Sequence, residues 1–177
     1  MRVIPFSRTY PAKHPRKGER TLFPAKIIES LLALGTYEVL DEHLELAFMD
    51  GDFTKYDVPP KWHTIRANRK DGKLWKVGDF FKPVVWSGKP YYSKQIQFAP
   101  PIEIKKVWDI QIEFIGKRID VQLPTDKPGQ FLLLSAGDVA KNDGLDVHDF
   151  IDWFAIHPKK KEVFKGQIIC WNESINY

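Results

Sequence analysis

Cysteine is almost absent from this 177-residue chain: Cys170 is the only one, so the chain can form no internal disulfide and no cysteine metal site. So little cysteine is typical of a reducing compartment, and we expect a cytoplasmic location. No uninterrupted apolar run approaches the roughly 18 residues of a membrane span. The N-terminal stretch MRVIPFSRTYPAKH also lacks the apolar segment of a signal peptide. The sequence therefore predicts neither membrane insertion nor export.

Several motifs that mark common enzyme classes are missing. The chain has no GxGxxG, no GxxxxGK followed by Ser or Thr, and no GxSxG. These absences argue against dinucleotide binding, phosphate-loop nucleotide binding and an α/β-hydrolase nucleophile. The five histidines, at positions 14, 43, 63, 148 and 157, are too scattered for HExxH or a tight metal cluster. We therefore expect no metal and no cofactor.

What is present is the composition of one globular domain. Hydrophobic residues make up 43% of the chain and charged residues 28%, which is ordinary for a soluble fold. The length suits one domain rather than two. Because residues 1–20 show no hydrophobic period, we expect an extended N-terminal arm there and a single domain over residues 21–177.

Charge is distributed in blocks of opposite sign. Residues 27–60 carry one Lys and eight acidic residues, whereas residues 61–106 carry eleven Lys/Arg and three acidic residues. The basic block also contains aromatic side chains, an alternation suited to a nucleic-acid groove. A solvated basic face over ordinary strand aromatics explains the same pattern equally well. The candidate binding residues in this block are Trp62, His63, Arg66, Arg69, Trp75, Lys76, Trp86 and Lys94.

Hydrophobic periodicity predicts two helices in the N-terminal third. Pro24 suits a first helical turn, apolar residues over 27–34 form a stripe, and Gly35 can end the helix. Apolar residues at four-residue spacing suggest a second, short helix within the acidic stretch 37–58.

Strand signals dominate the middle of the chain. Residues 74–86 predict two short strands around a turn at Gly78-Asp79. Apolar residues on even positions over 102–114 predict a half-buried strand, which Gly116-Lys117 can turn into a hairpin with residues 119–123. Residues 131–135 read as a short buried strand or the entry to a helix.

In the C-terminal third the sequence predicts two helices followed by a strand. Ser135 can cap a helix over 137–142, and Gly144 can end it. Residues 147–154 form an amphipathic pattern after Asp146, and GQIICW at 166–171 reads as a buried strand. Short strands with helices at both ends predict an α+β fold, a small mixed β-barrel with flanking short helices.

The densest cluster of reactive side chains is KWHTIR at 61–66. A threonine hydroxyl becomes a nucleophile when a base takes its proton, and a lysine can be that base if burial or a nearby cation lowers its pKa. Residues three apart on a straight strand face opposite ways, so Lys61 and Thr64 can meet only where the chain bends. Arg66 is a candidate for the nearby cation. The alternative is that Thr64 is a strand residue while Lys61 and Arg66 contact phosphates or solvent.

These segments together resemble a known family. KWHTIR, LWKVGD at 74–79, KNDGLDVHDFIDWF at 141–154 and GQIICWN at 166–172 are similar to the ASCH family of the PUA-like superfamily, especially its phage and Bacteroidetes-type members, as is WSGKPYYSKQI at 86–96. The resemblance spans roughly residues 21–172, with the acidic stretch 37–58 as an apparent insertion. It implies a PUA-like β-barrel with a cleft suited to RNA or a nucleobase.

The resemblance also implies a possible reaction. Some ASCH proteins are amidohydrolases that deacetylate acetylcytidine with a threonine, a lysine and a glutamate, and the first two correspond to Lys61 and Thr64. The acid falls at Asp143, so aspartate replaces glutamate. In this scheme Thr64 attacks the acetyl carbonyl, Lys61 accepts its proton and Asp143 assists proton delivery to the leaving amine.

Three functional hypotheses therefore stand. The first is recognition of RNA or of a modified nucleobase or nucleoside, with Arg66, Arg69, Lys76 and Lys94 on phosphates and Trp75 or Trp86 stacking on bases. The second is the amidohydrolase. The third is a phage or mobile-element accessory protein with a vestigial cleft, for which Lys61 and Thr64 would lie too far apart to hydrogen-bond.

Overall fold

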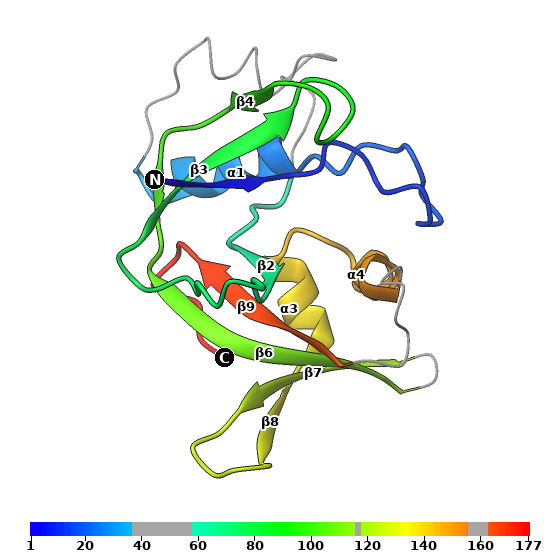
Figure 1. The fold of residues 1–177 in the computed structure, drawn as a ribbon, viewed down its shortest axis with the longest axis vertical. Helices are drawn as coiled ribbons and strands as arrows, with labels where there is room; N and C mark the ends of the chain where they lie inside the picture. The colour runs from blue at the N-terminus through cyan, green and yellow to red at the C-terminus, as the bar shows by residue number, and fades with distance from the viewer. Residues whose placement is uncertain (37–57, 116–117, 156–162) are drawn as a thin grey trace.

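The computed structural model describes residues 1–36, 58–115, 118–155 and 163–177, and it contains two β-sheets (Figure 1). In the first sheet, β1 pairs in parallel with β3, which pairs antiparallel with both β4 and β5. Its strands are β1 (Arg2–Pro5), β3 (Phe80–Trp86), β4 (Gln95–Gln97) and β5 (Ile102–Glu103).

The second sheet is antiparallel, with the strand order β2-β9-β6-β7-β8. Its central strand pairs join segments far apart in the sequence, because β9 lies between β2 and β6. The strands are β2 (His63–Ala67), β6 (Lys106–Ile115), β7 (Arg118–Pro124), β8 (Phe131–Leu134) and β9 (Phe164–Cys170).

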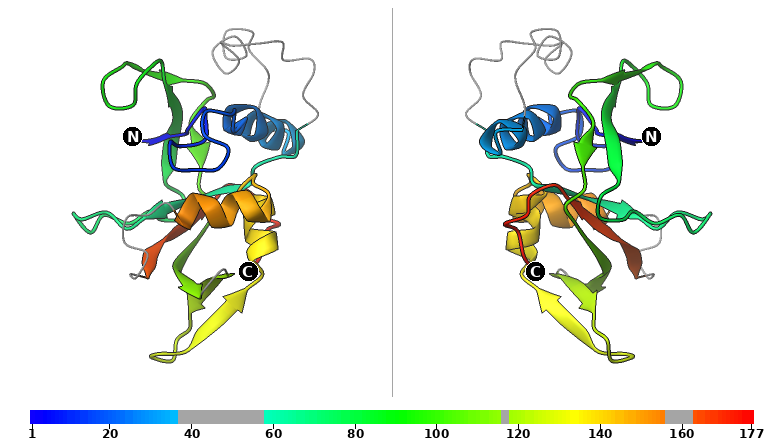
Figure 2. Two further views of the ribbon diagram at one scale, coloured as in Figure 1. Left: turned by 90° about the vertical axis from the view of Figure 1, so that its right-hand side faces the viewer. Right: turned by 90° about the vertical axis from the view of Figure 1, so that its left-hand side faces the viewer.

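Three helices are described: α1 (Phe23–Ala33), α3 (Ala136–Asn142) and α4 (Val147–Ala155). Helix α1 lies with the first sheet, whereas α3 and α4 lie beside the second (Figures 1 and 2). None of the helices in the described residues is long and apolar enough to cross a membrane.

The α+β class is confirmed, but in the described residues the strands form two separate sheets rather than one closed barrel. The predicted strand over 102–114 accordingly divides in two. Residues of β5 belong to the first sheet and residues of β6 to the second, and the chain crosses between them at Ile104 and Lys105. The Ile104 amide donates to Asp79 and the Lys105 amide to Cys170, so backbone pairing changes sheet within one residue.

The helix predictions agree with the structure where it can be compared. The helix predicted over 27–34 is α1, and the pair predicted after Ser135 is α3 and α4. The Ser135 hydroxyl accepts a hydrogen bond from the Asp138 amide at the start of α3. The helix predicted within 37–58 lies outside the described residues, apart from residue 58.

Two strand predictions need correction. Residues 74–79 form no strand, because the Trp75 amide donates to the side chain of Gln167 rather than to a neighbouring strand. Residues 131–134 do form a strand, β8, but Leu132 and Leu133 are exposed there instead of buried. The reason is position: β8 is the end strand of its sheet.

The N-terminal segment 1–20 is part of the packed structure. It begins as the extended strand β1, and Ile4, Phe6 and Tyr10 are buried in the hydrophobic core. The Tyr10 hydroxyl and the Arg16 guanidinium both donate to the Asp149 carboxylate of α4, over 2.8 and 2.5 Å. These bonds join the first twenty residues to the helix beside the second sheet.

Gly166 sits where two strands leave no room for a side chain. A Cβ added there would clash with the backbone carbonyl of Arg66 and lie 2.7 Å from the Phe164 ring. We predict that Gly166→Ala lowers the free energy of unfolding by about 2 kcal/mol or more, measured by urea denaturation. Gly137→Ala is the control: its Cβ would meet only the Ser135 hydroxyl at 3.7 Å, and helix propensity favours alanine. Equal stabilities of the two variants would contradict this packing.

Candidate functional site

A cavity of about 240 Å³ is lined by elements that belong to or pack beside each of the two sheets. The three predicted catalytic residues, Lys61, Thr64 and Asp143, are among its lining residues. The N-terminal segment, α1 and the end of β3 contribute from one side, and β2, α3 and α4 from the other. The lining residues are Pro5, Phe6, Ser7, Phe23, Lys61, Thr64, Ile65, Arg66, Trp86, Pro90, Tyr91, Asp143, Trp153 and Phe154.

A buried ion pair joins the KWHTIR and KNDGLD motifs, which lie 82 positions apart in the sequence at Lys61 and Asp143. The Lys61 ammonium donates to the Asp143 carboxylate over 2.6 Å and also to the Asp143 backbone carbonyl. The side chain of Lys61 is 1% exposed and that of Asp143 is 9% exposed. The ammonium also lies 4.4 Å from the centre of the Phe23 ring, a cation–π contact. The pair is therefore shielded from water on most sides.

Local backbone geometry brings Lys61 to this position. Lys61 precedes β2, and its amide donates to the Lys26 carbonyl of α1, while the next amide along the chain donates to Asn142 of α3. Gly144 ends α3 with a φ of +74°, and a Cβ there would lie 3.1 Å from Cβ of Lys61. A glycine is needed for both reasons, the left-handed backbone and the close approach.

Burial and charge change the proton affinities of the pair. Burial lowers the pKa of Lys61 to about 8, although Asp143 acts in the opposite direction. Burial acts to raise the pKa of Asp143, but attraction to Lys61 and His63 outweighs it and lowers the pKa. At neutral pH the pair is thus an ammonium and a carboxylate, and the ammonium can release its proton in mildly alkaline solution.

Thr64 lies in the same cavity but does not hydrogen-bond to Lys61. The residue is 4% exposed and sits on β2 opposite Ile169 of β9. Among the described residues its hydroxyl has no hydrogen-bond partner, so it is available to a ligand. Lys61 lies just before β2, which begins at His63, and its ammonium bonds to Asp143 rather than to Thr64, which is the outcome expected for a vestigial cleft.

Arg66 brings a second cation to the cavity wall. Its Nη2 donates to the Pro5 carbonyl over 2.8 Å, and its guanidinium lies 5.1 Å from the centre of the Phe6 ring. The Nε atom is buried without a hydrogen-bond partner in the described residues. Burial lowers the pKa of Arg66 to about 10, so the side chain is still charged at neutral pH. An unpartnered buried donor at a cavity wall is suited to a ligand acceptor.

His63 is buried behind the cavity rather than in its lining. Its side chain is 0% exposed, its Nδ1 lies 3.5 Å from the Asp143 carboxylate and its Nε2 lies 2.7 Å from the Tyr177 hydroxyl. His63 therefore does not itself line the cavity, and its nearest cavity-lining charged group is Asp143.

The remaining predicted binding residues are dispersed. Trp86 lines the cavity, whereas Trp62 is half-buried outside the lining and Trp75 is buried in the core beneath the guanidinium of Arg2, 3.6 Å from its ring centre. The exposed cations do not join the cavity: Arg69 pairs with Asp71 through two hydrogen bonds, and neither Lys76 nor Lys94 is among the lining residues.

The aromatic walls of the cavity went unpredicted as binding residues. None of Phe6, Phe23, Trp153 and Phe154 is among the predicted site residues, and only tertiary packing brings these side chains to the cavity that Lys61 also lines. Tyr91 had a weak signal, as an aromatic in the basic block. Its backbone has a φ of +68°, in the left-handed region that residues other than glycine seldom adopt, and its side chain is 86% exposed.

Comparisons of the chain with protein-family models, with curated proteins and with solved structures find no match. The described residues also contain no group of three or more His, Cys, Asp or Glu side chains arranged to hold a metal ion.

We predict strong energetic coupling between Lys61 and Asp143. Lys61→Met leaves a buried carboxylate without its cation and lowers the free energy of unfolding by about 3–5 kcal/mol. Adding Asp143→Asn removes the stranded charge and restores part of the loss, measured by urea denaturation as a double-mutant cycle. Lys105→Met, which breaks a partly exposed pair with Glu103, is the control and costs less than about 1 kcal/mol. Additive losses for the Lys61 and Asp143 variants would contradict the coupling.

Proposed function

We propose that this cavity recognises a modified nucleobase, presented as a free nucleoside or within RNA. The observation that carries the proposal is the combination of aromatic walls with buried, charged hydrogen-bonding groups: Lys61, Arg66 and Asp143 lie among the rings of Phe23, Trp86 and Trp153. Flat, apolar faces with polar edges are the property that a nucleobase presents to a protein.

The size of the cavity favours a small ligand. Its volume of about 240 Å³ lies below the roughly 300–1,000 Å³ of pockets that hold drug-sized molecules. A single base with its modification suits this space better than a stretch of stacked nucleotides. Trp86 and Tyr91, with ring centres 5.4 Å apart, lie together in the lining and offer a surface for stacking.

The polar groups favour a ligand edge rich in acceptors. Lys61 retains one ammonium proton beyond its two bonds to Asp143, and Arg66 offers its unpartnered Nε–H. The Thr64 hydroxyl can donate or accept. Carbonyl oxygens and ring nitrogens of a pyrimidine, or the carbonyl of an acyl group on it, complement these donors.

Binding within RNA is a further part of the proposal. The exposed cations Lys76 and Lys94, and Arg69 with its partner Asp71, lie outside the cavity lining, and in this proposal they bind phosphates of the RNA backbone.

We also propose that the chain is a PUA-like domain of the ASCH type. This assignment is supported by the KWHTIR and KNDGLD segments, whose residues Lys61, Thr64 and Asp143 line one cavity.

Binding is testable by quenching of tryptophan fluorescence, because Trp86 and Trp153 line the cavity. We predict saturable quenching by cytidine derivatives such as acetylcytidine, and at least a tenfold weaker affinity for Arg66→Gln, since about 1.4 kcal/mol of hydrogen bonding corresponds to a factor of ten. Arg69→Gln is the matched control and leaves nucleoside affinity unchanged.

The Arg69→Gln variant also tests RNA binding. Arg69→Gln should weaken binding of a short RNA at low ionic strength and reduce its salt dependence, because it removes a phosphate contact. Absence of binding to every nucleoside and to RNA at low salt would contradict the proposal.

A second candidate function, amide hydrolysis, is favoured by the lowered pKa of Lys61 beside an available threonine hydroxyl. In that reaction Thr64 Oγ forms a bond to the acyl carbon as neutral Lys61 takes its proton. The carbon–nitrogen bond then breaks, Lys61 returns the proton to the departing amine, and water hydrolyses the acyl ester. Asp143 acts through Lys61, which it holds in place.

This reaction requires Lys61 and Thr64 to approach within hydrogen-bond reach when substrate binds, since they are not bonded in the free protein. Such tightening is common in catalytic sites. We predict that release of cytidine from acetylcytidine, followed by chromatography, rises with pH and levels off above pH 8, because the base form of Lys61 has a pKa of about 8. Thr64→Val abolishes it. A wild-type protein that binds acetylcytidine without hydrolysing it contradicts catalysis and retains the binding function.

A further inference from the structure

His63 connects the candidate site to the C-terminal segment of the chain. Its ring is fully buried and has a polar neighbour at each nitrogen: Nε2 lies 2.7 Å from the Tyr177 hydroxyl, and Nδ1 lies 3.5 Å from Oδ1 of Asp143. The second contact is close but lacks the alignment of a hydrogen bond, because Nδ1 has no such partner in the described residues. The position of the proton on the His63 ring therefore decides whether an N–H group or a nitrogen lone pair lies next to the Asp143 carboxylate.

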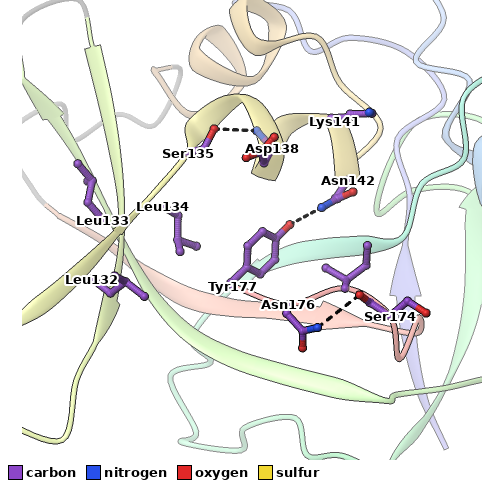
Figure 3. Close-up of a pocket in the computed structure, with 11 residues that line it drawn as sticks. Leu132, Leu133, Leu134, Ser135, Asp138, Lys141, Asn142, Ser174, Asn176 and Tyr177 are labelled. Carbon is purple, nitrogen blue, oxygen red and sulfur yellow. Dashed lines mark hydrogen bonds between the residues drawn. The ribbon is translucent and has the colours of Figure 1, made fainter.

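The Tyr177 hydroxyl determines that choice. The Asn142 side-chain amide donates to the Tyr177 oxygen over 2.9 Å (Figure 3). An amide NH₂ can only donate, so the tyrosine oxygen accepts from Asn142 and its own proton is left to donate to His63 Nε2. Nε2 is then the unprotonated nitrogen, and Nδ1 carries the hydrogen that faces Asp143.

The opposite arrangement is unfavourable. With a proton on Nε2, the tyrosine proton would have no acceptor among these three groups, and the Nδ1 lone pair would face a carboxylate. Protonation of both nitrogens is opposed by burial and by the charge of Lys61, which lower the pKa of His63 despite the attraction of Asp143. In a neutral ring with the proton on Nδ1, Nε2 accepts from the Tyr177 hydroxyl, and an N–H group rather than a lone pair lies 3.5 Å from Oδ1 of Asp143.

We propose that Tyr177 and His63 are positioning residues of the candidate site: the tyrosine hydroxyl selects the Nδ1–H form of His63, which keeps the Asp143 carboxylate turned toward Lys61. The inference deepens the proposed function and rests on it for its relevance to ligand binding. Neither residue belongs to the cavity lining, so they act on a ligand only through Asp143 and Lys61.

The position of Tyr177 is suited to this role. Its ring packs against His63 and Trp108, with centres 5.8 and 5.1 Å away, which fixes the position of the hydroxyl oxygen. Burial raises the pKa of the Tyr177 hydroxyl above its ordinary value, so it keeps its proton throughout the neutral range. Tyr177 also lines a second cavity, of about 480 Å³, together with Asn142 (Figure 3).

The tautomer is directly measurable by long-range ¹H–¹⁵N NMR on protein with labelled histidine, with the His63 signals assigned from a His63→Gln variant. We expect neutral His63 with the proton on Nδ1 at pH 7. Tyr177→Phe removes the donor to Nε2, so the Nε2–H form should appear. Tyr92→Phe is the matched control, because Tyr92 is 82% exposed and outside the cavity lining, and it leaves the tautomer unchanged. A proton on Nε2 in the wild type, or an unchanged tautomer in Tyr177→Phe, overturns the inference.

A second readout follows Lys61 itself. Lys61 is faced by the charges of Asp143, Arg66 and Lys26, of which only Asp143 favours the ammonium. A Nδ1 lone pair in Tyr177→Phe would repel the carboxylate and weaken this support, so the titration midpoint of Lys61, followed by lysine ¹³C NMR, should fall by about half a pH unit or more. Nucleoside affinity at pH 8 should fall with it.

The two measurements separate the positioning role from the proposed function, because neither the tautomer nor the Lys61 midpoint needs a ligand. A protein that shows both effects but binds no nucleoside supports the positioning role and contradicts the proposed function. An unchanged Lys61 midpoint in Tyr177→Phe overturns the positioning role, whatever the ligand affinity.

Discussion

The buried pair of Lys61 and Asp143 is the interaction on which the candidate site depends. Removing two charges from water is costly, and the loss is offset only where geometry and additional hydrogen bonds are good. Here the ammonium reaches both the carboxylate and the backbone carbonyl of Asp143, and a phenylalanine ring covers it. Every neighbouring element is arranged to permit that contact: the irregular approach to β2, the left-handed Gly144 that ends α3, and the carbonyl of Lys26 in α1.

The same pair joins the part of the molecule around the first sheet to the part around the second sheet. Lys61 enters from the segment between α1 and β2, Asp143 from the end of α3, and the N-terminal segment closes the cavity wall through Arg66 and Pro5. A ligand in this cavity would therefore contact elements of both sheets at once. Aromatic rings from the N-terminal segment, α1, β3 and α4 surround the charged groups of Lys61, Arg66 and Asp143 in this cavity, where burial strengthens hydrogen bonds.

Sequence reasoning was most successful where local signals are strong. A proline and an apolar stripe predicted α1, and a serine cap with a later glycine predicted the limits of α3. It was weaker for strands, because pairing partners are remote: the even-position pattern over 102–114 cannot indicate that the chain changes sheet at Ile104. Among the predicted site residues, Lys61, Thr64, Arg66, Trp86 and Asp143 meet in one cavity, whereas Trp75 packs in the core and Arg69, Lys76 and Lys94 lie outside the lining.

The sequence by itself determined the α+β class, the helices that its caps and periodicity specify, and the chemically unusual KWHTIR cluster, since each follows from neighbouring residues. Only the tertiary structure decided that Asp143 is the partner of Lys61, that His63 stands behind the cavity, and that Tyr177 sets the direction of its proton. Those contacts join residues separated by 82 and 114 positions. Burial and distance arise only when the chain has folded, and they are what convert an ordinary lysine into one with a pKa of about 8.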